Sequence, residues 1–337
     1  MAVKFTKPEI NVREKLAELD KPSGIAGEAM LRAETPQEQF NLIGAGRRNL
    51  AINGGFRVSQ RGDYTSATAV NNNQYYLDRF RCDRDSVTST VQQVVDGFRK
   101  GINSVKLTAT SSSSSGTFGQ VYKVNFTEFP ELFSGPVTFS AWVKTNHPET
   151  RLYVYSSGQK VPVKHSGNGQ WEKLVTTYDL SDVTSADFNV FPYDGALQNI
   201  TSGDYIEISQ FQIELGKVAT PFEHRSYGEE LALCQRYFQN VYNGQCFGSA
   251  NTTTRMRINA PLSPEMRTDP TVARVAGTIS FQGMGVSISS TSTAVAQASD
   301  SGTRYLGMDL GGFSGLTARS YAGSQSRTLV FTADAEL

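Results

Sequence analysis

Apolar and polar residues alternate with a period of two along most of the chain after residue 48. Segment 136–145 is typical, because Phe139, Ala141 and Val143 fall on one side of an extended chain. The same pattern predicts strands at 86–95, 102–111, 118–126, 136–145, 151–158, 170–180, 187–194 and 204–215. Clusters of Gly, Ser, Asn and Pro separate them. About eight strands at this spacing predict an antiparallel β-sandwich, a jelly roll, over residues 49–222.

The last part of the chain, residues 245–337, returns to short strand-like runs with turn residues between them. We expect about six further strands there, which would form a C-terminal β domain. Residues 283–302 contain few large apolar side chains, so this region is expected to pack more easily against copies of itself. The whole chain is therefore predicted to be all-β with short helices.

One helical segment interrupts the strands. Ser226 is placed to cap a helix, with Glu229 three residues later as its capping-box partner. Apolar residues then recur at helical spacing and form one stripe: Leu231, Cys234, Phe238 and Val241. Asn243 and Gly244 end the pattern. We therefore predict a connecting helix within residues 223–244.

The first 48 residues have few large apolar side chains and two short helical patterns. Val12, Leu16 and Leu19 share one face of the first pattern, which Pro22 ends. The second pattern, 35–44, starts with a capping Thr followed by Pro, and it carries Phe40. Neither pattern could fill a core alone. We predict that residues 1–48 form an extended or helical arm that docks on a partner, and the alternative is a flexible tail.

Composition excludes several classes of function. Formal net charge is zero, and the isoelectric point is ≈ 6.8, which argues against nucleic acid as the main partner although a local basic patch remains compatible. No apolar run approaches the ~18 residues of a membrane span, and the N-terminus lacks the apolar stretch of a secretory signal. Cys82, Cys234 and Cys246 cannot all pair, so we expect free, mostly buried thiols in a reducing cytoplasm.

Catalytic and metal-binding motifs are weak. His147, His165 and His224 sit in turn-like contexts without a nucleophile motif beside them. No cofactor is expected. Asp83 and Asp85 could ligate calcium with loop carbonyls, although a solvated turn explains them as well. A glycosidase would need two carboxylates, for which the candidate pairs are Asp182 with Asp187 and Glu207 with Glu214. We expect Glu207 and Glu214 to point to opposite faces of one strand, because they are seven residues apart.

Sugar binding has more support. The inward alternation of segment 136–145 turns Trp142 outward, and the pattern of 151–158 does the same for Tyr153 and Tyr155. Aromatic rings stack on the apolar faces of sugars, while Tyr hydroxyls can bond to sugar hydroxyls. We therefore predict an exposed strip of these three side chains that binds carbohydrate. The alternative is that a loop or a neighbouring subunit covers this face and that Trp142 is core. Trp171 is expected to be core.

Four segments match one family in the right order. "RRNLAINGGFRVSQRGD" with "YYLDRFRC", "VTFSAWVKT", "WEKLVTTYDL" and "GDYIEISQFQIELGKVATPFEHRSYGEELALCQRYF" resemble a β-sandwich domain of fibre and receptor-binding proteins from tailed phages. The resemblance covers about residues 47–240. The arm segment "KPSGIAGEAMLRAETPQEQFNLIGAG" is similar to the virion-attachment ends of such fibres. The family's sandwich resembles lectin-like and carbohydrate-binding-module jelly rolls.

The resemblance implies a virion structural protein, usually a homotrimer, made in the bacterial host cytoplasm. We expect a non-enzymatic tail fibre that binds a host surface glycan and contacts other virion proteins through its arm. In such a trimer, the helical stripe would face the threefold axis, and the alternative is a helix lying on its own sandwich. Two other functions remain open: a capsid-decorating head fibre without a dedicated receptor, and a cell-surface polysaccharide hydrolase.

Overall fold

The computed structural model describes residues 48–337 except 157–158, 161, 194–195, 276–278, 284–285, 291–301, 313–315, 317–320, 324–328 and 337. The predicted anchor residues of the arm lie outside these described residues: Val12, Leu16, Leu19 and Phe40. Within the described part of the chain, no helix is both long and apolar enough to cross a membrane.

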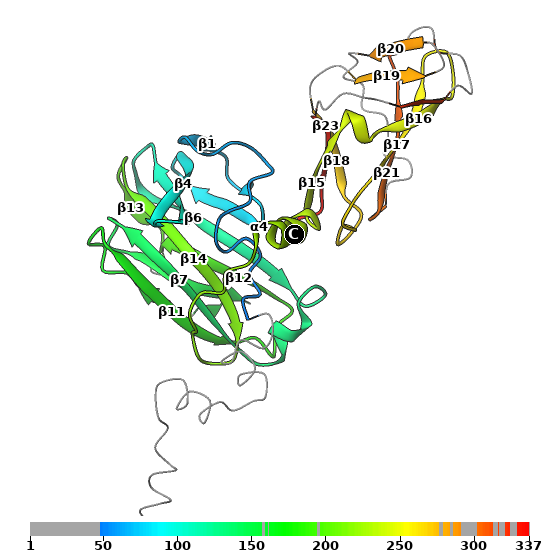
Figure 1. The fold of residues 1–337 in the computed structure, drawn as a ribbon. Coiled ribbons are helices and arrows are strands. Elements are labelled where there is room, and N and C mark those ends of the chain that lie inside the picture. The colour runs from blue at the N-terminus through cyan, green and yellow to red at the C-terminus, as the bar shows by residue number, and fades with distance from the viewer. Residues whose placement is uncertain are drawn as a thin grey trace, which may run out of the picture.

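The predicted fold class is confirmed, because two antiparallel sheets pack against each other as a β-sandwich (Figure 1). The six-stranded sheet has the order β1 (Thr68–Val70), β4 (Ser89–Arg99), β5 (Ile102–Ala109), β14 (Tyr205–Leu215), β7 (Pro136–Thr145) and β11 (Trp171–Asp179). The eight-stranded sheet has the order β10 (Val163–Lys164), β8 (Thr150–Ser156), β12 (Ser185–Pro192), β6 (Ser113–Asn125), β3 (Phe80–Asp85) and β2 (Gln74–Leu77), with β13 (Gln198–Ile200) on β6 and β9 (Gln159–Lys160) on β8. A short 3-10 helix, η1 (Pro130–Ser134), precedes β7.

Aromatic rings from both sheets fill the sandwich core. The ring of Phe211 on β14 lies 4.6 Å from that of Phe139, 5.1 Å from that of Phe80 and 5.5 Å from that of Tyr122, measured between centroids. All four side chains are fully buried. Phe139 lies on the same sheet as Phe211, whereas Phe80 and Tyr122 lie on the opposite sheet. The apolar residues of the alternating pattern therefore meet between the two sheets.

A bulge in β14 lets the N-terminal segment join the six-stranded sheet. The pairing of β14 with β7 shifts between Ser209 and Gln212, where Gln210 has a positive φ of 50°. Beyond this bulge, the N–H of Leu50 donates to Ile213 and the N–H of Phe211 donates to Gly54. A Cβ on Gly54 would lie 2.0 Å from the Phe211 carbonyl oxygen, so this close approach requires glycine.

The connecting helix is shorter than predicted. Helix α4 spans Tyr227–Gln235, and the Ser226 side chain accepts the bond from the N–H of Glu229, as expected for its cap. Residues 238–242 instead form strand β15 (Phe238–Tyr242), which pairs with β23 near the C-terminus. Aromatic and β-branched residues favour extended structure, and this segment contains three of them: Phe238, Val241 and Tyr242. Pairing with the distant strand β23 makes the segment a strand and not a helix.

The predicted trimer stripe on this helix is wrong, because one chain already buries its side chains. Cys234 is fully buried against Ile52 and Val58, and Leu231 packs on the same cluster. Val241 belongs to the core of the C-terminal region. The helix therefore lies on its own sandwich.

The C-terminal region forms two further sheets and a separate core. The three-stranded sheet has the order β15, β23 (Leu329–Asp334) and β18 (Thr271–Arg274). The six-stranded sheet has the order β20 (Val286–Ser290), β19 (Ile279–Gly283), β22 (Tyr321–Gly323), β16 (Phe247–Ala250), β17 (Met256–Pro261) and β21 (Tyr305–Leu310), and η2 (Asn243–Gln245) precedes β16. The core between them includes Ile258, Leu306 and Phe331.

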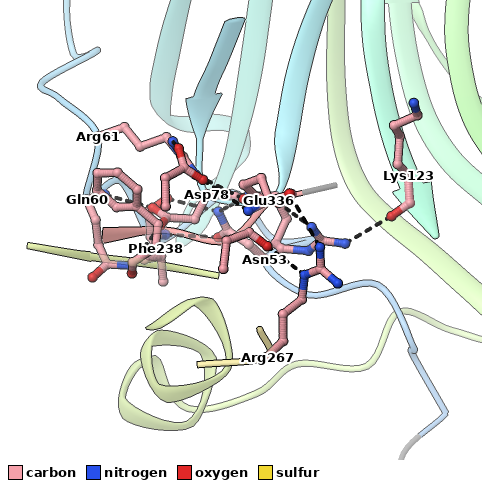
Figure 2. A network of polar contacts seen from close by, with 12 residues as sticks. Asn53, Gln60, Arg61, Asp78, Lys123, Phe238, Arg267 and Glu336 are labelled. Carbon is pink, nitrogen blue, oxygen red and sulfur yellow. Dashed lines mark hydrogen bonds and ion pairs between the residues drawn. The ribbon is translucent and has the colours of Figure 1, made fainter. Parts of the chain in front are cut away.

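Buried ion pairs join the end of the chain to the sandwich (Figure 2). The guanidinium of Arg79 pairs with Glu336, donates to the Lys123 carbonyl at 2.9 Å and lies 3.6 Å from the centroid of the Tyr237 ring. Its side chain is 0% exposed. Burial works against the charged form, but the attraction of Glu336 raises the pKa of Arg79. We call this contact the junction.

A second arginine strengthens the junction. Arg61 pairs with Asp334 at 2.7 Å and with Glu336 at 3.2 Å. Its guanidinium also lies 4.0 Å from the centroid of the Phe238 ring. Phe238, which the sequence placed at a trimer axis, therefore serves the contact between the sandwich and β15 (Figure 2).

Replacing Glu336 with Gln is expected to lower the free energy of unfolding by ~3–5 kcal/mol, because Arg79 stays buried without its ion-pair partner. Denaturant unfolding measures the change. The matched control is Glu265→Gln, which breaks the exposed pair with Arg304 and is expected to change the free energy of unfolding far less, because solvent screens that pair. Equal losses in the two variants would contradict the importance of the junction.

Candidate functional site

The six-stranded sheet of the sandwich has a second side, which points away from the core. On β7, Ala141 and Val143 are buried in the core, so Trp142 and Lys144 point to the outer side. Trp142 is half-buried there. We call this surface the Trp142 face, formed by outward side chains of β5, β14, β7 and β11: Lys106, Glu207, Ser209, Trp142, Lys144, Trp171 and Lys173.

Strand register lines up one row of side chains across the Trp142 face. Glu207 on β14 lies opposite Lys106 on one side and Lys144 on the other. Lys144 in turn lies opposite Trp171 on β11. Neighbouring strands are about 4.8 Å apart, so the four strands of this row span roughly 14 Å. That width suits an extended ligand rather than a small molecule.

Glu207 is fixed inside this row. One carboxylate oxygen accepts a hydrogen bond from the Ser104 hydroxyl at 2.6 Å, and the other lies 3.6 Å from the Lys144 ammonium. The Glu207 side chain is only 7% exposed, whereas that of Lys144 is 33% exposed. The lysine is therefore positioned by the carboxylate and still reaches solvent.

Three aromatic rings gather in the middle of the Trp142 face. The ring of Phe98 lies 5.0 Å from that of Trp142 and 4.9 Å from that of Trp171. All three side chains are half-buried. Two cations stand beside them: Arg99 at 5.8 Å from the Trp142 ring and Lys144 at 5.9 Å from the Trp171 ring. We call Phe98, Trp142 and Trp171 the aromatic cluster.

Phe98 reaches this cluster because the β4–β5 hairpin folds over the sheet. Phe98 belongs to β4, which is separated from β7 by β5 and β14. The β4–β5 pairing shifts between Val94 and Arg99, so the residues between them bulge out of the ladder. A Cβ on Gly97 would lie 2.0 Å from the Ser104 hydroxyl, which means that glycine is needed for this bend.

The predicted strip of three aromatics is wrong, because Tyr153 and Tyr155 lie on β8 in the other sheet. They point away from the core on the opposite side of the sandwich from Trp142. Tyr153 is 8% exposed and packs against Phe191 at 6.4 Å. Tyr155 is 43% exposed and borders a hollow of ≈ 280 Å³ that Lys123 and Asp187 also line. Which sheet a strand joins is a long-range outcome that alternation does not encode.

Both carboxylates of one predicted hydrolase pair are committed to internal bonds. Glu207 and Glu214 lie on the same outer side of β14, contrary to the expectation, because the bulge at Gln210 adds a residue between them. Glu214 is 1% exposed and accepts bonds from the N–H and the hydroxyl of Thr220. The other pair is split between the turn before β12, which holds Asp182, and β12 itself, which holds Asp187.

Metal ligation has no support in the described part of the chain, where no group of three or more His, Cys, Asp or Glu side chains could hold an ion. Asp83 lies 3.5 Å from a guanidinium nitrogen of Arg81, and Asp85 accepts a bond from the Ser86 hydroxyl. His165 is fully buried with its ring nitrogen 3.1 Å from the Val143 carbonyl. These groups have structural partners.

Sequence reasoning missed Phe98 and misplaced Trp171. Leu174 and Tyr178 point into the core, and Trp171 is an odd number of positions from Leu174, so alternation along β11 already places Trp171 outside. No comparable signal marks Phe98, because its position depends on the bulge and on how the hairpin folds over the sheet.

Comparison of the sequence with protein-family models and with curated proteins gives no match. Solved structures do match. One is the carbohydrate-binding module TmCBM61 in complex with β-1,4-galactotriose, at 17% identity and a TM-score of 0.32 over 50% of this chain and 98% of that chain. Another is the family 11 carbohydrate-binding module of the cellulase Lic26A-Cel5E from Clostridium thermocellum, at 13% identity and a TM-score of 0.28 over 48% and 99%.

Tailspike protein 4 of bacteriophage CBA120 also matches, at 10% identity and a TM-score of 0.28 over 40% of this chain and 19% of that chain. The structural neighbours of the chain thus include β-sandwich carbohydrate-binding modules and one phage tailspike. At these identities and TM-scores, any function has to be argued from the side chains of the chain itself.

Replacing Gly97 with Ala is expected to push the hairpin away and separate Phe98 from Trp142 and Trp171. The two tryptophans of the chain both belong to this cluster, so tryptophan emission, excited selectively over that of the tyrosines, reports on it. We expect the emission maximum to move to longer wavelength and the overpacking to cost ~1–3 kcal/mol. Gly135→Ala is the control, because no atom lies within 4 Å of the added Cβ. Unchanged emission in Gly97→Ala would contradict this account of the hairpin.

Proposed function

We propose that this chain is a non-enzymatic virion fibre protein of a tailed phage and that its Trp142 face binds a glycan on the host surface. The observation that carries the proposal is the aromatic cluster, three half-buried rings grouped on the outer side of a sandwich sheet. Sugar rings present apolar C–H faces that stack on such rings, while neighbouring polar groups fix orientation.

The polar neighbours suit a saccharide. The Lys144 ammonium is partly exposed beside Trp171, and Lys173, which lies opposite Trp142 on β11, is exposed as well. Charged groups next to an aromatic platform can bond to sugar hydroxyls beside a stacked ring. The row across β5, β14, β7 and β11 gives an extended chain several contacts in line.

A binding role is favoured over hydrolysis by the state of the carboxylates. Glycoside hydrolysis needs two carboxyl groups that reach the scissile bond. On the Trp142 face, Glu207 is held by Ser104 and Lys144, and Glu214 is buried under Thr220. A polysaccharide hydrolase is therefore the weaker alternative for this face.

A phage fibre role follows from the sequence resemblance of residues 47–240 and from the arm that precedes them. We propose that residues 1–48 attach the protein to the particle and that the chain forms a homotrimer. Since the α4 stripe is buried within one chain, the trimer contact must use other surfaces. A head fibre on the capsid would share the anchor and the sandwich but would not need the aromatic cluster.

Replacing Trp142 with Ala is expected to lower adsorption to host cells sharply while changing the melting temperature little. Each stacked ring contributes about 1 kcal/mol, which is roughly fivefold in the affinity of one site. Repeated sites on a fibre would raise this effect through avidity. The control is Tyr155→Ala, which removes an exposed ring on the opposite side of the sandwich. A drop of ~3–5 kcal/mol in stability for Trp142→Ala would mark Trp142 as core and refute the proposal.

Deleting residues 1–45 is expected to leave a folded trimer that no longer incorporates into particles. The described sandwich starts at residue 48, after the deletion. Sedimentation of the truncated protein gives its mass, and particle assembly assays give its incorporation. A monomer at micromolar concentration would contradict the trimer, and particles that still carry the truncated protein would contradict the anchor.

A further inference from the structure

We propose that the ligand of the Trp142 face is an acidic glycan, one whose sugars carry carboxylate or phosphate groups. This inference rests on the proposed glycan-binding function and names the chemical class of its ligand. It follows from an excess of positive charge around the aromatic cluster, in a chain whose formal net charge is zero.

Four cations and two carboxylates surround the aromatic cluster. The cations are Lys106, Lys144, Lys173 and Arg99. Both carboxylates already have partners within the chain. Glu207 holds Ser104 and Lys144, and Asp96 accepts the backbone N–H of Gly101 at 2.6 Å, within its own hairpin. The cations therefore outnumber the carboxylates, and the face presents positive charge.

The cations stand where a stacked sugar would place its acid group. Arg99 lies 4.7 Å from the Phe98 ring and 5.8 Å from the Trp142 ring. Lys144 lies 5.9 Å from the Trp171 ring. A sugar stacked on either tryptophan would thus hold a carboxylate or phosphate within reach of a guanidinium or an ammonium. Bonds between such charged groups are about twice as strong as neutral ones.

Lys106 extends the positive charge along the row. It lies directly opposite Glu207 in the ladder, but Lys144 is the lysine that pairs with Glu207. The Lys106 ammonium instead lies 4.5 Å from the centroid of the Tyr205 ring. The row therefore has one cation on each side of Glu207, namely Lys106 and Lys144. This spacing suits acid groups that repeat along a polymer.

Near the exposed tyrosine on the opposite side of the sandwich, the described side chains show no such excess. Among them, the hollow beside Tyr155 is lined by Lys123 and Asp187. At the edge of that sheet, Arg151 and Lys164 both pair with Glu149, at 2.8 Å and 2.6 Å. These two cations give a matched control, because they too are an arginine and a lysine in partly exposed positions.

The test compares acidic bacterial polysaccharides with the same polymers after chemical reduction of their carboxylates, and with phosphate-bearing and neutral polymers. Quenching of tryptophan fluorescence in the full-length protein measures binding. We expect acidic polymers to bind, and carboxylate reduction or the double variant Arg99→Gln/Lys144→Gln to weaken binding about tenfold or more. Raising salt from ~0.01 M to ~1 M should weaken binding too, because the screening length falls from about 30 Å to about 3 Å.

The control variant Arg151→Gln/Lys164→Gln removes the same two charges from the other sheet and should leave binding unchanged. Neutral polymers that bind as tightly as acidic ones, with no effect of salt or of Arg99→Gln/Lys144→Gln, would overturn the acidic class and leave the glycan function standing. Single-stranded oligothymidylate that binds more tightly than any polysaccharide would overturn it as well, in favour of a nucleic-acid ligand. Quenching by no polymer at all would refute the glycan function itself.

Discussion

Strand β14 determines which side chains of the sandwich's six-stranded sheet face the core and which face outward. The rest of the sandwich depends on this strand. It pairs with β7 along most of its length and with β5 up to Ile208, after which the segment Leu50–Gly54 takes its place. The bulge at Gln210 is what permits this exchange of partners. Because side chains alternate, burying Ile206, Ile208 and Phe211 in the core forces Glu207 and Ser209 to the outer side. The Trp142 face is thus a consequence of how the core is packed.

Local alternation in the sequence was sufficient to predict which face of its own strand a side chain occupies. It predicted the sandwich, and it turned Trp142 away from the core because Ala141 and Val143 are apolar neighbours. It failed where the answer depends on a distant segment. Tyr153 shares the outward orientation of Trp142 but not its sheet, since β8 pairs with β12 and not with β7. Phe238 fits a helical stripe equally well, and its pairing with Asp334, close to the C-terminus, makes it a strand residue.

The junction illustrates the same dependence on distance. Arg79 and Glu336 are 257 positions apart, and nothing in the local sequence of either marks an ion pair. Burying both charges is costly, so such pairs act less as a source of stability than as a constraint on which arrangement is allowed. Here the constraint holds β15 and β23 against the sandwich, since Phe238 and Asp334 both contact Arg61.

Burial separates the cations that shape the fold from those available to a ligand. The Arg79 side chain is 0% exposed, and its guanidinium lies 3.6 Å from the Tyr237 ring and pairs with Glu336. Lys144 is 33% exposed, and its distance of 5.9 Å from the Trp171 ring leaves room for solvent or a bound group. The Lys144–Glu207 pair joins a buried carboxylate to a lysine that still reaches solvent, so this lysine can also contact a ligand. The same contact, an arginine or lysine beside an aromatic ring, therefore stabilises the arrangement of the chain at the junction. On the Trp142 face it leaves a cation that a ligand can reach.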